Sequence, residues 1–294
     1  MVSVSTAATA RGCSTRPGRC LTRIYLDAAR HYYLWSLPEV ELVVVVNGPV
    51  PLLYPDGTGS PDAEGVTFAD AGSLGGLYVA TERDNNASAV SRNSILWFDV
   101  NAAGATLTAT REWNLTADLP VVGPNVGIEG VTWIPDSFLV ARGFFDESKG
   151  HTYNPSEYLN HGTGLFFVGV EANGLIYAYA LDDSGTFNRI ATITSGFTGV
   201  MDVQFDRETN DLWVVCDDSC GGRSAVLRID PITHKFAVAR IFDRPTTMPN
   251  LNNEGFAIAP VAECVADRRP VFWADDSETG GHAIRVGTLT CSPF

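Results

Sequence analysis

Four segments of this chain repeat one short pattern, and this repeat constrains the fold more than any other feature. They read DAEGVTF at 62–68, GIEGVTW at 127–133, GVMDVQF at 199–205 and NNEGFAI at 252–258. Each has a turn residue, then an acid, then the short apolar alternation typical of a β-strand. Their recurrence at intervals of roughly 40–70 residues indicates a repeat architecture.

More strands follow each repeat, separated by clusters of Gly, Asp, Asn and Pro. We predict second strands at 76–84, 137–147, 211–218 and 271–276, third strands at 94–100, 164–181, 224–230 and 282–289, and fourth strands at 107–115, 187–193 and 235–242. Recurring four-stranded antiparallel meanders predict an all-β fold, a β-propeller. A β-sandwich is the alternative, but it would not explain an acid at the head of each repeat.

A fainter repeat precedes these four, because IYLDAARHYYLWS at 24–36 resembles VQFDRETNDLWVV at 203–215. The segment 1–23 matches nothing downstream, and we expect it to be irregular. We therefore predict one propeller domain over 24–294, with five recognisable blades or a six-bladed fold whose first blade is incomplete. The expected blades are 24–58, 62–115, 127–195, 199–245 and 252–291.

The charge of the chain bears on its partners. Asp and Glu outnumber Lys and Arg 34 to 20, which gives a formal charge of −14. Nucleic acids and anionic membranes attract cationic patches, so we expect neither as a partner. No apolar run reaches the roughly 20 residues that span a bilayer. The first residues lack the basic lead and apolar centre of a signal peptide. We expect a monomer that binds a small molecule.

The cysteines indicate an oxidising compartment. Cys216 and Cys220 lie four residues apart, and Cys264 and Cys291 bracket the last repeat. Both spacings suit disulfides, and these favour a secreted, periplasmic or extracellular protein. Buried free thiols are an alternative. Zinc is disfavoured because no Cys or His pair has ligand spacing.

Acids recur at two equivalent places in the repeats. In a propeller the first strand of each blade lines the axis, and the second runs back beside it, so these places share one channel mouth. The strand starts carry Glu64, Glu129, Asp202 and Glu254; the strand ends carry Glu82 with Asp84, Asp146 with Glu147, Asp217 with Asp218, and Asp275 with Asp276.

Gathered carboxylates repel one another by about 4 kcal/mol per pair at about 4 Å in an intermediate dielectric. A hard cation offsets that repulsion, and Ca²⁺ accepts six to eight oxygens, with Mg²⁺ or Mn²⁺ as alternatives. The acids that we predict as metal ligands are Glu64, Glu129, Asp202, Glu254, Asp218 and Asp276. Any single acid could instead cap a loop by accepting backbone N–H bonds.

The last two repeats share a second pattern, DDSCGGRSAVLR at 217–228 and DDSETGGHAIR at 275–285. The glycines permit a tight loop on the channel face, from which Arg223 and His282 could reach a ligand. A solvated loop tip is the alternative. His161 follows an insertion at 151–160 that could cover the channel, or it is an inert loop histidine.

Two pairs of motifs, EGVTF with LYVATERDN and NNEGFAI with FWADDSETGG, resemble the calcium-dependent, phytase-like propeller family described as having esterase-like activity. The likeness covers about residues 60–291. Gluconolactonase and paraoxonase propellers, which also begin strands with Glu-Gly and hold a central cation, are similar to a lesser degree. The resemblance implies that Glu64, Glu129 and Glu254 face a metal, with Asp202 replacing Glu in the third repeat.

Two functions remain open at this point. The first is a metal-dependent hydrolase of a phosphoester, ester or lactone, in which an acid acts as base. The expected catalytic residues are Glu129, Glu254, His282 and Arg223. The second is a non-catalytic propeller that binds a ligand or a protein, with structural calcium.

Overall fold

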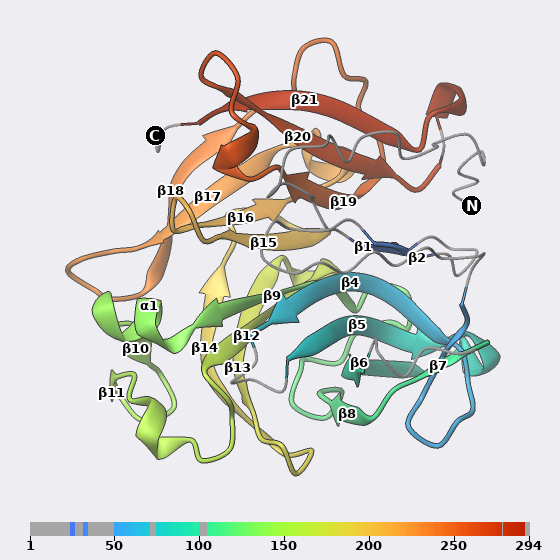
Figure 1. Ribbon diagram of the computed structural model, residues 1–294, viewed down its shortest axis with the longest axis vertical. Helices are drawn as coiled ribbons and strands as arrows, with labels where there is room; N and C mark the ends of the chain where they lie inside the picture. Colours follow the sequence, from blue (N-terminus) through green and yellow to red (C-terminus); the bar gives the residue numbers. More distant parts are fainter. Residues whose placement is uncertain are drawn as a thin grey trace, which may run out of the picture.

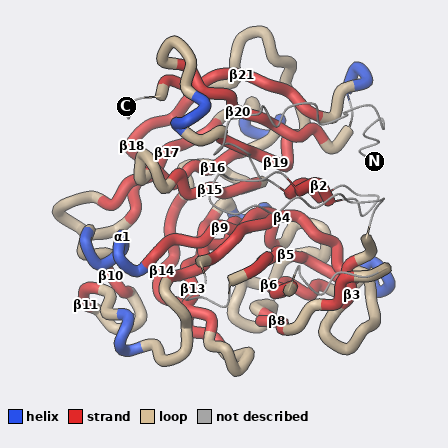
Figure 2. Tube along the Cα trace, viewed as in Figure 1, coloured by secondary structure: helices blue, strands red, loops and turns tan. Residues whose placement is uncertain are grey.

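The computed structural model describes residues 50–70, 75–99, 105–277 and 279–291, together with the backbone of two short strands at 24–26 and 32–34. The described chain is nearly all β-structure, and its short helical segments lie in the loops (Figure 2). No helix among these residues has the length and apolar character needed to cross a membrane.

Four antiparallel sheets form the blades of a β-propeller, which confirms the predicted fold class (Figure 1). Blade 1 contains β4 (Pro61–Ala69), β5 (Gly76–Asp84), β6 (Ser91–Phe98) and β8 (Arg111–Asn114). Blade 2 contains β9 (Ile128–Pro135), β12 (Gly164–Val170), β13 (Leu175–Leu181) and β14 (Phe187–Thr194). Blade 3 contains β15 (Asp202–Asp206), β16 (Asp211–Val215), β17 (Ser224–Ile229) and β18 (Phe236–Phe242). Blade 4 has three strands, β19 (Asn253–Ile258), β20 (Arg268–Asp275) and β21 (Ile284–Thr290).

Three short strands are described before and beside blade 1. β1 (Ile24–Leu26) and β2 (Tyr32–Leu34) form a separate antiparallel pair, and β1 runs beside β4 (Figure 1). β3 (Leu52–Leu53) pairs in parallel with β7 (Leu107–Thr108) of the following repeat. The described part of the chain therefore shows four blades. The predicted irregular segment 1–23 and most of the predicted first blade lie outside the described residues.

The second repeat contains an insertion where we predicted a strand at 137–147. The chain instead forms helix α1 (Asp136–Ala141) and a small hairpin of β10 (Phe145–Asp146) and β11 (His151–Thr152). Pro135 occupies the N-cap position, Asp136 lies in the first turn, and Gly143 follows the helix at φ +65°. These are ordinary helix start and stop signals. The second strand of this blade is therefore β12, and β13 is the third.

The inner strands contact one another around the axis in the order β4, β9, β15 and β19. One repeated position links them. Thr67 Oγ1 accepts a hydrogen bond from Trp133 N at 3.3 Å, and Thr132 Oγ1 accepts one from Phe205 N at 2.9 Å. Gln204 Oε1 accepts a third from Ile258 N at 3.1 Å. The polar residue inside each apolar strand thus joins its blade to the next one.

In blades 1 and 2 glycine follows the glutamate because the inner strands approach closely there. A Cβ on Gly65 would lie 2.7 Å from Gly130 Cα, and a Cβ on Gly130 would lie 2.7 Å from Val203 N. Backbone atoms cannot move aside as a flexible side chain can. The Glu-Gly pair therefore sets the spacing of the blades as well as placing an acid.

We expect Gly130→Ala to destabilise the protein by about 1–3 kcal/mol, because the added methyl group overpacks two strand backbones. Urea unfolding of the variant measures this change. Gly123→Ala is the matched control, since its Cβ would meet only the Val126 side chain, at 3.2 Å. Equal stability of the two variants would contradict the close approach of the blades.

Candidate metal centre

Three inner-strand glutamates are β-bulge residues. In blade 1 the register passes from Ala63↔Thr81 to Gly65↔Ala80, so Glu64 has no partner. Glu129 in blade 2 and Glu254 in blade 4 are skipped in the same way. A bulge re-aims a side chain out of the regular alternation of a strand. The repeated Glu-Gly motif thus corresponds to a repeated local geometry.

Blade 3 departs from this geometry at Asp202. The β15–β16 register is continuous. A Cβ on Gly130 would lie 2.8 Å from Asp202 Cα, just as a Cβ on Gly65 would lie 2.7 Å from Gly130 Cα, so Asp202 occupies the glycine position of the repeat. Its carboxylate accepts hydrogen bonds from Val203 N at 2.7 Å and from Phe256 N at 2.7 Å. The structure thus gives Asp202 a role in joining blade 3 to blade 4, and buried Met201 stands where the other blades carry Glu.

The ends of the second strands supply further acids. Glu82 lies in β5, two residues before its end, with 2% of its surface exposed, and Asp276 follows β20. In blade 2 the equivalent residue is Glu171, which follows β12. The pair that we predicted there, Asp146 and Glu147, lies in the insertion instead. The sequence contained the signal for Glu171, because VGVE at 168–171 occupies the same place in its repeat as VATE at 79–82 does in blade 1.

Glu82 also positions Glu129. Glu82 Oε2 accepts a hydrogen bond from Gly127 N, and Asn93 Oδ1 accepts one from Ile128 N, both at 2.9 Å. Glu82 and Asn93 are almost fully buried. Two side chains of blade 1 therefore hold the backbone immediately before the bulge of blade 2.

The pKa values show that these acids influence one another. Burial, followed by the charges of Asp62 and Glu82, raises the pKa of Glu64 well above its usual value. Burial, then Glu64 and Glu82, does the same to the pKa of Glu129. Burial raises the pKa of Glu82 to about 7, against the opposing hydrogen bond from Gly127.

Acids of the other blades belong to the same group. Burial and then Asp276 raise the pKa of Glu254 to about 7, although a hydrogen bond from Asn252 opposes them. Burial, then Asp217, raises the pKa of Glu171. The charge of Glu254 also acts on Glu64 and Glu129. Glu64, Glu129 and Glu254, from three separate blades, are therefore close enough to interact.

The donor set suits a hard cation. Carboxylate oxygens of Asp62, Glu64 and Glu82 lie within 4.8 Å of one another. Two oxygens on one Ca²⁺ ion, each at about 2.4 Å, are at most about 5 Å apart, so this spacing is compatible with shared ligation. Asp62 already pairs with Arg83 Nε at 2.7 Å and accepts a hydrogen bond from Asn85 Nδ2 at 2.9 Å. Glu129, on whose pKa the charges of Glu64 and Glu82 act, is a further acid that could hold a cation here.

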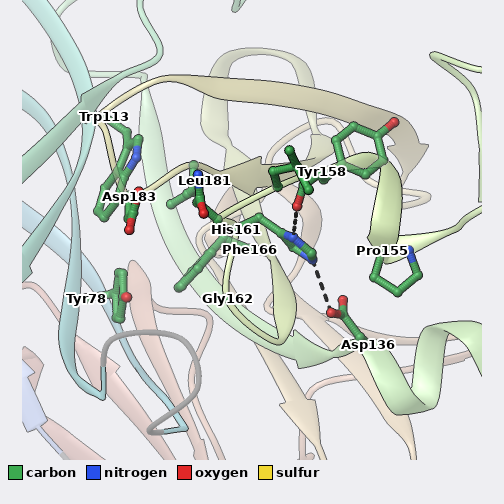
Figure 3. Close-up of a pocket in the computed structure, with 12 residues that line it drawn as sticks. Tyr78, Trp113, Asp136, Pro155, Tyr158, His161, Gly162, Phe166, Leu181 and Asp183 are labelled. Atoms are coloured by element: carbon green, nitrogen blue, oxygen red, sulfur yellow. Dashed lines mark hydrogen bonds and ion pairs between the residues drawn. The ribbon is translucent and has the colours of Figure 1, made fainter.

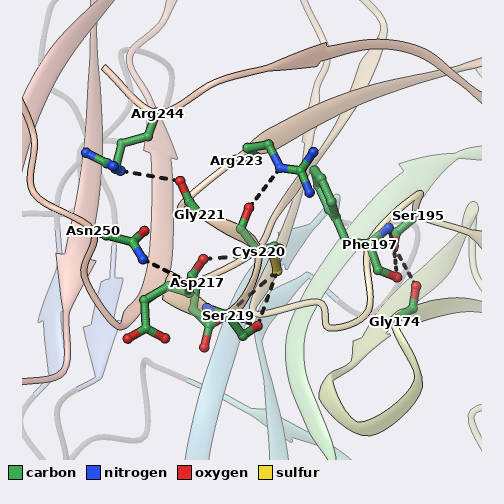
Figure 4. Close-up of a disulfide and its surroundings, with 12 residues drawn as sticks. Gly174, Ser195, Phe197, Asp217, Ser219, Cys220, Gly221, Arg223, Arg244 and Asn250 are labelled. Atoms are coloured by element: carbon green, nitrogen blue, oxygen red, sulfur yellow. Dashed lines mark hydrogen bonds between the residues drawn. A yellow bond between two sulfur atoms is a disulfide. The ribbon is translucent and has the colours of Figure 1, made fainter. Parts of the chain in front are cut away.

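The disulfide loop of blade 3 separates its two adjacent aspartates. Asp217 is buried, and its Oδ1 accepts hydrogen bonds from Ser219 N at 3.0 Å and Ser219 Oγ at 2.6 Å (Figure 4). Asp218, the predicted ligand, is exposed. Only Asp217 of this pair acts on Glu171 and Glu254.

Among the described residues, neither Arg223 nor His282 forms a hydrogen bond or an ion pair with these carboxylates. Arg223 Nε donates to Cys220 O at 2.8 Å, and its guanidinium lies 5.6 Å from the centre of the Phe197 ring (Figure 4). His282 is exposed in the loop before β21. In blade 4 Asp275 caps its loop by accepting bonds from Ser277 N and Thr279 N, whereas Asp276 acts on Glu64 and Glu254.

His161 lies away from this centre. The insertion begins at the end of β9, seven residues after Glu129, which is roughly 23 Å along an extended strand. The insertion therefore lies at the opposite end of β9 from the carboxylates, and 151–160 does not cover their end of the channel.

Both predicted disulfides are confirmed. Cys216 pairs with Cys220 and Cys264 with Cys291, with Cα–Cα distances of 6.1 and 6.0 Å. The second bridge fastens the end of β21 to the loop after β19. Within the described residues this blade has no fourth strand beyond β21, so the bridge stabilises an edge.

Comparison with known proteins identifies no family. No family model and no curated protein sequence matches the chain. Among solved structures, the chain is similar to Saccharomyces cerevisiae Sqt1, with a TM-score of 0.41, 13% identity, and coverage of 80% of this chain and 47% of that one. It is also similar to a putative 6-phosphogluconolactonase from Bacteroides uniformis, with a TM-score of 0.40, 13% identity, and coverage of 92% of this chain and 68% of that one.

A third similar structure is β-fructofuranosidase from Schwanniomyces occidentalis, with a TM-score of 0.46, 13% identity, and coverage of 84% of this chain and 46% of that one. The chain thus spans about half the length of Sqt1 and of this enzyme. None of their activities carries over to this chain, and the propeller assignment rests on its own strand order.

Proposed function

We propose that the protein is a hydrolase of a phosphoester, ester or lactone that depends on a divalent cation, with Ca²⁺ as the expected ion. The observation that carries this proposal is the convergence of bulged glutamates from three blades, with raised pKa values, at one end of the inner strands. Burying interacting acids costs free energy, and a bound cation would offset that cost. The resemblance of EGVTF and FWADDSETGG to phytase-like propellers agrees with this choice.

Each acid has a distinct role in the proposal. Glu64, Glu82 and Glu129 would hold the cation, with Asn93 and Glu82 fixing the backbone before Glu129. A bound cation lowers the pKa of its water and polarises a substrate oxygen. Glu254 would act as general base, because a pKa of about 7 allows it to accept a proton near neutrality. Asn252 Nδ2 orients Glu254 by donating to its Oε1 at 2.9 Å.

The expected contributions of Arg223 and His282 change. Arg223 is engaged with Cys220 and Phe197, so we do not assign it to the substrate. His282 is exposed and would reach a substrate only from the rim. The Nε atom of Arg83 lies 4.0 Å from Glu82 Oε1, but Arg83 is paired with Asp62. A neutral ester or lactone therefore fits this centre better than a phosphoester.

We expect Glu254→Gln to lose most of its Ca²⁺-dependent turnover of p-nitrophenyl acetate or p-nitrophenyl phosphate while its melting temperature stays close to that of the wild type. Removing a positioned general base costs on the order of 10²–10⁴ in rate. The matched control is Glu157→Gln, an exposed acid in the insertion. Full activity of Glu254→Gln would overturn the assignment of the base.

The alternative is a non-catalytic propeller with structural calcium, favoured by the fact that neither Arg223 nor His282 joins the acids. Calcium that raises the melting temperature without chelator-sensitive turnover of either ester would support it. Two disulfides are typical of oxidising compartments, so we further propose that the protein is secreted. A monomer that binds a small molecule remains our expectation in either case.

A further inference from the structure

The insertion of blade 2, residues 136–163, connects blade 2 to blade 3. The ring of Phe144, which is almost fully buried, lies 6.0 Å from the ring of Phe167 in β12 and 5.7 Å from the ring of Phe236 in β18. The backbone N–H of Phe145 donates at 2.8 Å to a carbonyl oxygen in the turn before β18. The interactions that hold the insertion in place therefore also hold this contact between the two blades.

His161 lies at the centre of a buried hydrogen-bond network in the insertion. It is 6% exposed and lines a pocket of about 440 Å³ together with Asp136 and Tyr158 (Figure 3). Its Nε2 atom lies 3.1 Å from Asp136 Oδ2 and 2.9 Å from Tyr153 Oη, and its Nδ1 atom faces the carbonyl oxygen of Tyr158. Tyr153 Oη also donates to Asp136 Oδ1 at 2.8 Å. The His161 ring thus ties the start of the insertion, at Asp136, to its end.

Only the protonated form of His161 satisfies this network. The Tyr158 carbonyl and the Asp136 carboxylate can only accept, and Tyr153 has a single proton to donate. A neutral ring with its proton on Nδ1 cannot donate to Asp136. A neutral ring with its proton on Nε2 turns a lone pair of Nδ1 towards the Tyr158 oxygen. Loss of the ring proton therefore leaves a buried acceptor without its donor, which costs free energy.

The charged groups around His161 favour the protonated form. Burial would lower the pKa of His161, but the hydrogen bond and charge of Asp136, the Tyr158 carbonyl and the charge of Asp182 outweigh it and raise that pKa above its ordinary value of 6.5. Asp183 is a further acid on the wall of the pocket, and no Lys or Arg is among the residues that line it. Burial raises the pKa of the Tyr158 phenol to about 12, so this hydroxyl stays neutral.

We propose that the insertion is a pH-sensitive strap, which protonated His161 locks across blades 2 and 3 and which loss of that proton releases. Opening exposes His161 to water, where its pKa returns to the ordinary value. Because the folded value is the higher one, the contribution of His161 to stability is fully present below about pH 6.5 and is lost as the pH rises through the folded pKa. The strap is separate from the proposed metal centre and does not depend on it.

Hydrogen exchange of the full chain measures the opening, once the rates are corrected for the pH dependence of intrinsic exchange. We expect the amides of residues 142–163 to lose protection as the pH rises from about 5.5 to about 8.5, and those of β12 to change less. An NMR titration gives the pKa of His161. The opening constant should increase tenfold for each unit by which that pKa exceeds 6.5. CaCl₂ in every buffer separates this effect from that of the carboxylates.

Variants assign the pH dependence to this network. His161→Gln cannot ionise, so exchange of its insertion should no longer depend on pH across this range. Asp136→Asn should lower the pKa of His161, because burial then acts without the opposing charge. His151→Gln is the matched control, an exposed histidine of the same insertion, and should behave as the wild type.

Three results would overturn the proposal. The first is a pKa of His161 in the folded wild type at or below 6.5. The second is protection of the wild-type insertion that does not change with pH. The third is a His161→Gln variant that keeps the pH dependence of the wild type. The first two use the unmodified chain, so they decide the matter even where a variant fails to fold.

Discussion

Replacing Arg269 with methionine is expected to destabilise the protein by about 3–5 kcal/mol, the usual cost of removing one partner from a buried ion pair. Arg269 lies on β20 with 2% of its surface exposed. Its Nη2 donates to Asp206 Oδ2 at the end of β15, and its Nη1 donates to Ala259 O at 3.3 Å. The pair therefore joins blades 3 and 4 at the end of β15 away from Asp202.

The loss of stability arises because Asp206 stays buried without its positively charged partner. Asp206 is also buried, and without Arg269 it keeps only bonds from Glu208 N at 3.0 Å and Thr209 Oγ1 at 2.9 Å, together with any water that enters. Methionine preserves most of the volume of the arginine stem, so the loss reports the charge rather than a cavity.

Urea unfolding at neutral pH measures the effect. Arg268→Met is the matched control, because Arg268 is the preceding residue of the same strand and is exposed, so its loss should stay within about 0.5 kcal/mol. Asp206→Asn combined with Arg269→Met should be less destabilising than the sum of the single changes, because the pair is coupled. Equal stability of the Arg268 and Arg269 variants would refute the buried pair.

The Glu-Gly motif shows how far the sequence could predict this fold. The Glu-Gly repeat correctly indicated propeller blades. Glu64 and Glu129 are bulge residues, and Gly65 and Gly130 lie against the backbone of the neighbouring inner strand. The third repeat does not follow this rule, because Asp202 is not equivalent to the glutamates of the other repeats. Asp202 looks like a shortened Glu, but the unbroken β15 register moves it into the glycine position, where it binds backbone N–H groups. A one-residue offset of this kind cannot be recognised from the sequence, because it depends on the register of the paired strands.

The insertion of blade 2 explains the other main difference. SFLVARGFF has the apolar content of a strand, but Pro135 and Asp136 start a helix, which buries Leu139. Taking this segment as the second strand assigned the channel acids to Asp146 and Glu147 instead of Glu171. It also hid the pocket, since Asp136, Tyr158 and His161 are brought together by tertiary structure and share no sequence motif.

A pH titration in the presence of EDTA should reveal the cost of gathering the carboxylates. Burial raises the pKa of Glu82 from 4.5 to about 7. Between these values the folded state binds more protons than the unfolded chain, so stability must fall as pH rises through this window. For nearly buried Glu82 a shift of this size corresponds to about 3 kcal/mol, and Glu254 changes stability in the same direction.

We therefore expect the free energy of unfolding in EDTA to decrease by a few kcal/mol between about pH 5 and about pH 8. CaCl₂ added at the higher pH should restore it, because a ligand at 100 times its Kd stabilises the folded state by about 2.7 kcal/mol. Glu82→Gln keeps an oxygen for Gly127 N but cannot ionise, so its stability in EDTA should depend less on pH and respond less to calcium. A stability in EDTA that stays level or rises across this range would show that the acids are not buried together, and the proposed metal centre would fail with it.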